Sequence, residues 1–260
     1  MIDIYKELLD HLAPRATLLS DVAVPVDLKS ERIMAVVEVT NPGIVKKTLN
    51  KAFSKDPQAK ARLYKDETIW EILQGQELAA DETELMIEGV GFVSTEAPKD
   101  GDKAKEKEAP KNAALPNMAI TVFKDYLIVS THVDFIQEFI DHHAAGAGLG
   151  GEADYGRVRD TLVKLGSKDD SFHFFSRTDE SYRATYELLK QGKLPEAETM
   201  LARLLNAMTG PKEDGAIRKQ EIDGSKLPEF EKVQKYLGPG GLFAQTDDNG
   251  WWLVGCLLKK

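Results

Sequence analysis

Hydrophobic positions near the start of the chain change from a helical to an extended period. Apolar residues recur at helical spacing over 3–12, and Pro14 ends that pattern. Starting so close to the terminus, this helix looks like part of a longer segment. Apolar runs then predict strands at 16–22 and 32–40, joined by a loop around Pro25.

A strand pattern that occurs twice suggests an internal repeat. An Asn-Pro pair at 41–42 first predicts a capped helix that runs to about residue 54. Residues 63–70 then resemble residues 122–129, because each pair of apolar runs flanks a Lys-Asp turn. A helix at 133–143 follows the second copy. Lys-Asp lacks the Asn-Gly preference of two-residue hairpins, so longer turns are expected. The pattern predicts two related βα halves.

The last third of the chain is predicted to be rich in helices. Helical signals stand at 155–165, after Thr178 or Asp179, from Pro195 to Gly210 and from Pro228 to Gly238, with an aromatic strand at 171–176. A hairpin over 241–258 is expected to turn at Asn249-Gly250, which would place Phe243 opposite Cys256. Its second strand is apolar on both faces, so we expect a covered core strand with both tryptophans, Trp251 and Trp252, buried.

These elements predict an α+β fold with a largely antiparallel sheet or sheets, built from two related βα halves and covered by helices mainly from the C-terminal third. Residues 94–117 alternate lysine with acidic residues and contain three prolines, which indicates a linker or surface loop. The expected organisation is therefore an N-terminal half at 1–93, this linker, and a helix-rich C-terminal half at 118–260.

Composition narrows the possible functions. The chain is 42% hydrophobic and 30% charged and has a net charge of −9, which predicts a soluble acidic globular protein and disfavours nucleic acid as a partner. Its one cysteine, Cys256, excludes an internal disulfide and a cysteine-rich zinc site. No apolar run is long enough for a membrane span, and no targeting signal is recognisable.

Two motifs resemble known binding sites but lack the residues that those sites need. The glycine-rich run at 146–151 follows a helix and lacks the Gly-Lys-Ser/Thr ending of a phosphate-binding loop. Asp134, Glu138 and His142 share one helix face, but they are too few for a zinc site and form the polar side of an amphipathic helix. The sequence therefore predicts no cofactor, no metal and no catalytic residue.

The aromatic strand and the helix after it offer the best ligand-binding candidates. His173 and Arg177 share one face of an alternating strand, and Asp179 stands at the start of the following helix. Arg177 could bind an anion, or it could form an ion pair with Asp179 or Glu180. In a competing interpretation of the terminal hairpin one tryptophan is exposed, and Trp251 would then be a candidate anchor for a partner protein.

Three segments also resemble a known family. Residues 174–180, 223–228 and 236–239 are similar to segments of an uncharacterised family of large envelope-associated proteins of planctomycete bacteria. The likeness extends over most of the chain, and members of that family are typically longer at the N-terminus and have no established activity. The resemblance implies a truncated domain, with the cell envelope as a possible compartment, and it implies no mechanism.

The sequence thus favours a non-catalytic interaction or structural module, a fragment of a larger bacterial protein whose partners are another protein or the other domains of its parent. The alternative is a small-ligand-binding protein or hydrolase-like enzyme with a site near Arg177 and His173. No motif assigns an enzymatic activity, and the oligomeric state is not readable from the sequence.

Overall fold

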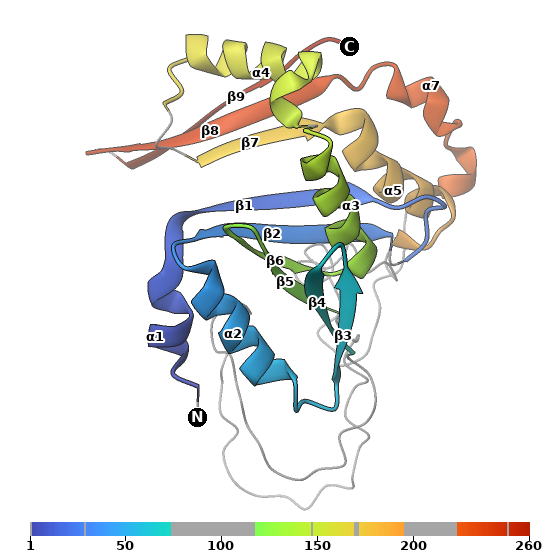
Figure 1. The fold of residues 1–260 in the computed structure, drawn as a ribbon. Helices are drawn as coiled ribbons and strands as arrows, with labels where there is room; N and C mark the ends of the chain where they lie inside the picture. Colours follow the sequence, from blue (N-terminus) through green and yellow to red (C-terminus); the bar gives the residue numbers. More distant parts are fainter. Residues whose placement is uncertain are drawn as a thin grey trace, which may run out of the picture.

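The protein is built around two antiparallel sheets. A computed structural model describes residues 2–28, 30–73, 118–146, 148–168, 172–194, 223–248 and 250–260 (Figure 1). The larger sheet contains β1 (Leu12–Val22), β2 (Glu31–Val39), β3 (Ala59–Tyr64), β4 (Glu67–Ile72), β5 (Met118–Phe123) and β6 (Tyr126–Ser130). The smaller sheet contains β7 (Phe172–Arg177), β8 (Pro239–Asp247) and β9 (Gly250–Leu257). The α-helices are α1 (Ile4–Glu7), α2 (Pro42–Phe53), α3 (Val133–Ala144), α4 (Ala153–Lys164), α5 (Thr178–Lys190) and α7 (Phe230–Gln234). The predicted α+β class is confirmed.

Strands from both predicted halves of the chain lie in the larger sheet. Its order is β1-β2-β6-β5-β4-β3, and every neighbouring pair is antiparallel. Two pairings cross between the halves: β2 with β6, and β4 with β5. The sequence left open whether the halves form one sheet or two, and these pairings show that the segments 31–39, 59–72 and 118–130 form one.

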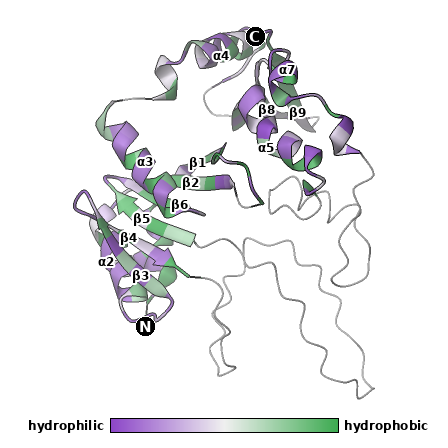
Figure 2. Ribbon diagram, turned by 90° about the vertical axis from the view of Figure 1, so that its right-hand side faces the viewer, coloured by the Kyte–Doolittle hydropathy of each residue, from purple (hydrophilic) through white to green (hydrophobic). Residues whose placement is uncertain are grey.

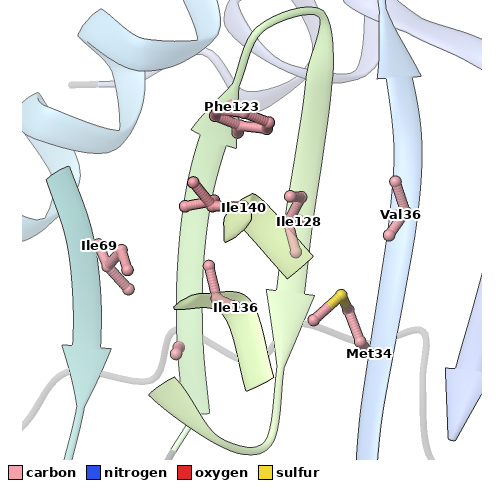
Figure 3. Packing of buried hydrophobic residues seen from close by; sticks show 8 residues of the cluster. Met34, Val36, Ile69, Phe123, Ile128, Ile136 and Ile140 are labelled. Carbon is pink, nitrogen blue, oxygen red and sulfur yellow. The ribbon is translucent and has the colours of Figure 1, made fainter. Parts of the chain in front are cut away.

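Helices α2 and α3 cover opposite faces of the larger sheet. On one face Ile136 and Ile140 of α3 pack into a cluster that includes Met34, Val36, Ile69, Phe123 and Ile128 (Figure 3). On the other face α2 contributes Val45 and Leu49 to a cluster with Val39, Trp70, Val122 and Leu127. Neighbouring residues of one strand, such as Leu127 and Ile128, belong to different clusters because side chains alternate across a sheet. The middle strands of this sheet are therefore buried on both sides, whereas the edge strands β1 and β3 are mostly exposed.

Helix α2 begins where its local sequence predicts, whereas the N-terminal helix is shorter than expected. The Asn41 side chain accepts a hydrogen bond from the Ile44 N–H at 3.2 Å, and a proline occupies the first turn. The predicted helix over 3–12 breaks at Leu8, whose backbone leaves helical geometry; a short 3-10 turn (Leu9–His11) follows. Pairing of Leu12 with Val39 then draws the chain into β1, four residues before the predicted strand.

The Lys-Asp turns of the repeated pattern contain two residues, so the expectation of longer turns was wrong. Tyr64 pairs with Glu67, and Phe123 pairs with Tyr126. Lys65, Asp66 and Lys124 adopt positive φ angles of 46°, 67° and 50°, the left-handed region that tight hairpins require. The sheet contacts on either side stabilise these turns despite the unfavourable residue types. Whether the two hairpins share an origin stays a prediction.

The smaller sheet has the order β7-β8-β9 and is covered on one face by α4. Val158 and Leu162 of α4 pack against Phe243, which lies in the central strand and is 1% exposed. Both views place α4 alongside β8 and β9 (Figure 1, Figure 2). A Cβ on Gly241 would lie 2.6 Å from a methyl of Val158, so the helix approaches the strand closely at that point.

The register of the C-terminal hairpin differs from the predicted one by two residues. Phe243 pairs with Val254 rather than with Cys256, and Asp247 pairs with Gly250. The turn therefore lies one residue earlier than an Asn249-Gly250 turn would place it. Because the difference is an even number, every side chain still lies on its expected face of the sheet.

Helix α5 connects the two sheets. Its Leu188 packs with Leu194 and with Val26 and Leu28, which belong to the loop between β1 and β2. Arg177 occupies the N-cap position, so the expectation of a cap at Thr178 or Asp179 was wrong. The Thr178 hydroxyl instead donates to the Gly238 carbonyl at 2.7 Å, which joins the start of α5 to the segment before β8.

Two predicted segments lie outside the described residues: the linker at 94–117 and the helix from Pro195 to Gly210. The helices predicted at 155–165 and after Pro228 correspond to α4 and α7, and the strand predicted at 171–176 corresponds to β7.

Candidate interaction surface

Arg177 forms an ion pair, though not with the residues expected from the sequence. Its Nε lies 2.6 Å from Asp154 Oδ2, and its Nη2 lies 2.9 Å from Glu152 Oε2. The hydrogen bond between Arg177 and Asp154 raises the pKa of Arg177 and lowers the pKa of Asp154. Both carboxylates come from the start of α4, so Arg177 fastens that helix to the end of β7. It is therefore a poor candidate for binding an external anion.

His173 is exposed and lies beside a serine. Its Nε2 is 2.6 Å from Ser167 Oγ, the loop residue that follows α4. A serine nucleophile needs its histidine oriented by a third group. In the described part of the chain, no hydrogen bond or ion pair joins His173 to a carboxylate. Three residues of extended strand lie between His173 and Arg177, a distance of about 13 Å, so the two do not form one compact site.

The other two candidates lie in different places again. Asp179 forms an ion pair with Lys260, which anchors the last residue of the chain to the first turn of α5. Trp251 pairs with Thr246 toward the turn of the hairpin, on the face of the sheet opposite that of His173. The sequence-predicted residues Arg177, His173, Asp179 and Trp251 therefore do not converge, and three of them have partners within the chain.

The surface around Trp251 is the most unusual feature of the smaller sheet. Strand alternation and pairing place one set of side chains on the face away from α4, which we call the open face. Its larger side chains are Phe172, Phe174, Leu242, Trp251, Leu253 and Leu257. The remaining positions are small or hydroxylated: Ser176, Gly240, Ala244, Thr246 and Gly255. This set contains no charged residue.

The open face is strongly exposed to solvent. Trp251 is 82% exposed, Leu253 and Leu257 are each 71% exposed, Phe172 is 60% and Phe174 is 48%. Isolated apolar side chains on a surface are ordinary, but a contiguous patch of several usually marks a binding site. The sequence-based expectation that β9 is a covered core strand was wrong, because β9 is an edge strand with only one covered face.

Trp252 occupies the covered face but lies at its margin. It is 50% exposed, and its indole N–H donates to Asp247 Oδ2 at 2.9 Å. The expectation of a buried core tryptophan was therefore wrong for this residue as well. Cys256 shares that face and is partly buried against α4.

Asp134 and Glu138, on the polar face of α3, bind an arginine that the sequence did not reveal. Arg32 of β2 is buried, and it donates hydrogen bonds to Asp21, Asp134 and Glu138 at 2.6 to 3.2 Å. Hydrogen bonds to Asp21 and Glu138 raise the pKa of Arg32. No sequence signal identifies this network, because Arg32 lies about a hundred residues from Asp134 and Glu138. Through Arg32, Asp134 and Glu138 thus connect α3 to β2 and, by way of Asp21, to β1.

Other potential sites have little to support them. A cavity of about 130 Å³ beside α2 is smaller than ordinary ligand sites, and two of the three charged residues that line it, Lys46 and Glu67, already form an ion pair at 2.6 Å. Within the described ranges, no group of three or more His, Cys, Asp or Glu residues is placed to hold a metal. No helix in that same part of the chain is long and apolar enough to cross a membrane.

No protein-family model, curated protein or solved structure matches this chain. The resemblance to planctomycete envelope-associated proteins therefore stays a prediction, and the open face is the feature from which function can be argued.

Proposed function

We propose that this chain is a non-catalytic interaction module that binds a protein partner through the open face. The observation that carries the proposal is the exposure of five large apolar side chains on one uncharged sheet face. Water contact with that much apolar surface is unfavourable, and burying it against a partner relieves the cost. Aromatic residues such as Trp251, Phe172 and Phe174 are also the types enriched at the energetic centres of protein interfaces.

The edges of the two sheets differ in a way that supports this proposal. Exposed edge strands are normally protected from pairing by charges or proline. In the larger sheet β1 carries Pro14 and Arg15, and β3 carries Lys60 and Arg62. Strand β9 has neither a charge nor a proline over its eight residues, Gly250–Leu257. An edge without this protection can also pair with a strand of another protein.

Site-specific photocrosslinking in cells that naturally make the protein tests the proposal. A benzoylphenylalanine replaces Trp251 on the open face or, as the control, Leu63 on β3, which is 76% exposed. We expect defined crosslinked adducts at position 251 and none at position 63. Equal adducts at the two positions, or no adduct at 251, would contradict the proposal.

A further inference from the structure

We infer that the partner of the open face is a second copy of this chain, packed face to face so that the two small sheets form a sandwich. This inference rests on the proposed function and names the partner. A symmetric dimer uses the same surface patch on both subunits, so the patch must be compatible with itself. An uncharged apolar face meets this condition, because no charge is placed opposite a like charge when the two copies meet.

The size of the open face matches that of a small dimer interface. A fully exposed aromatic side chain offers about 150–250 Å², so the exposed fractions of the three aromatic residues amount to about 300–450 Å² per copy. Leu253 and Leu257 add about 100 Å² each per copy, so two copies would bury about 1,000–1,300 Å². Specific interfaces begin at about 1,000 Å², and those at the lower end are weak and reversible. We therefore expect a dimer that forms at high concentration.

The relief of the open face is also compatible with self-packing. The central strand β8 presents mainly small side chains there, including Gly240 and Ala244. The flanking strands present bulky ones, Phe172 and Phe174 on β7 and three more on β9. Leu242 is the one large side chain that β8 adds to this face, so large and small side chains are mixed across it. Because sheets in a sandwich pack about 10 Å apart with interdigitating side chains, the large side chains of one copy can pack against the small positions of the other.

Net charge opposes the association, so the dimer should depend on salt concentration. Each copy carries a net charge of −9, so two copies repel one another at low ionic strength. The open face itself is uncharged, so salt screens the repulsion without weakening the contact. Dimerisation should therefore strengthen between about 0.05 M and about 0.5 M salt. An interface formed by opposite charges would show the reverse dependence.

Sedimentation equilibrium of the full chain tests the inference. Between about 5 and about 500 µM we expect the mass to rise from 28.8 kDa toward twice that value. Leu253→Ser on the open face should weaken the association by at least about tenfold, a loss equal to one buried leucine contact. Leu63→Ser is the matched control, since Leu63 and Leu253 are similarly exposed strand residues of different sheets. Because Leu253 has little burial to lose, its variant should keep the wild-type unfolding midpoint.

Binding of a fluorescent apolar dye separates failure of the dimer from failure of the proposed function. A wild-type chain that stays at 28.8 kDa throughout, or whose association the two serine variants weaken equally, refutes the second copy as partner. If the monomeric chain then binds the dye and Leu253→Ser reduces that binding, the open face stays available to a different protein. If the monomer binds no dye, the open face is covered within the chain, and both proposals are refuted.

Discussion

Truncation of Phe243 should cost far more stability than truncation of Trp251, although both are large aromatic residues of the same hairpin. Phe243 is 1% exposed and packs against Val158 and Leu162 of α4. Phe243→Ala would leave a cavity beneath the helix, at a cost of about 3–5 kcal/mol. Trp251 has less than a fifth of its surface buried. Scaling the same range by that fraction gives less than about 1 kcal/mol for Trp251→Ala.

Urea unfolding followed by far-ultraviolet circular dichroism measures both variants without depending on tryptophan fluorescence. Measurements at about 5 µM keep association from adding to the apparent stability. We expect the midpoint of Phe243→Ala to shift strongly and that of Trp251→Ala to stay close to wild type. Equal and large losses of stability in the two variants would show that Trp251 and the open face are buried within the chain and not exposed.

Three further changes probe the contacts that hold the fold together. Arg32→Met should lower the free energy of unfolding by about 1–3 kcal/mol, because three carboxylates lose a shared buried partner but can be hydrated again. Urea unfolding measures this loss, and an unchanged midpoint would show that the network does not stabilise the fold. Gly241→Ala should cost about 1–3 kcal/mol, because its Cβ would clash with α4, whereas the control Gly150→Ala meets nothing within 4 Å and should be neutral in the same assay. Arg177 lowers the pKa of Asp154, so their ion pair stabilises the fold above the ordinary aspartate pKa, and this stabilisation is lost as the pH falls through the lowered pKa. Asp154→Asn should therefore be less stable than wild type at pH 7, and the difference in stability should become smaller toward pH 3. Equal stability of the two proteins at pH 7 would show that the ion pair contributes nothing.

Local chemistry predicted some parts of the fold from the sequence. The start of α2 depends only on the Asn41 side chain and the proline beside it, and both act as their residue types suggest. Hairpin geometry was harder to predict, because packing can override turn preference. Lys65 and Lys124 adopt left-handed conformations that a lysine side chain disfavours, and the terminal hairpin turns one residue before its strongest local signal.

Long-range contacts were not predictable from the sequence. An apolar strand such as β9 suggests burial, but its residues do not show whether any element lies over each face. Likewise, Asp134 and Glu138 are recognisable as a polar helix face, whereas their shared partner Arg32 lies about a hundred residues away. Such pairings depend on how distant segments come together, and one sequence without that information gives only the residue types.

Arg177, which first suggested a ligand site, instead supports the surface on the other side of the sheet. Arg177 holds the start of α4 through Asp154 and Glu152, and α4 in turn packs closely over Phe243 and Gly241. These contacts fix the covered face of the smaller sheet, and a sheet fixed on one face presents the other with little freedom to rearrange. A preorganised surface loses less conformational entropy on binding. Arg177 therefore acts on the proposed interface indirectly, by positioning the sheet that carries it.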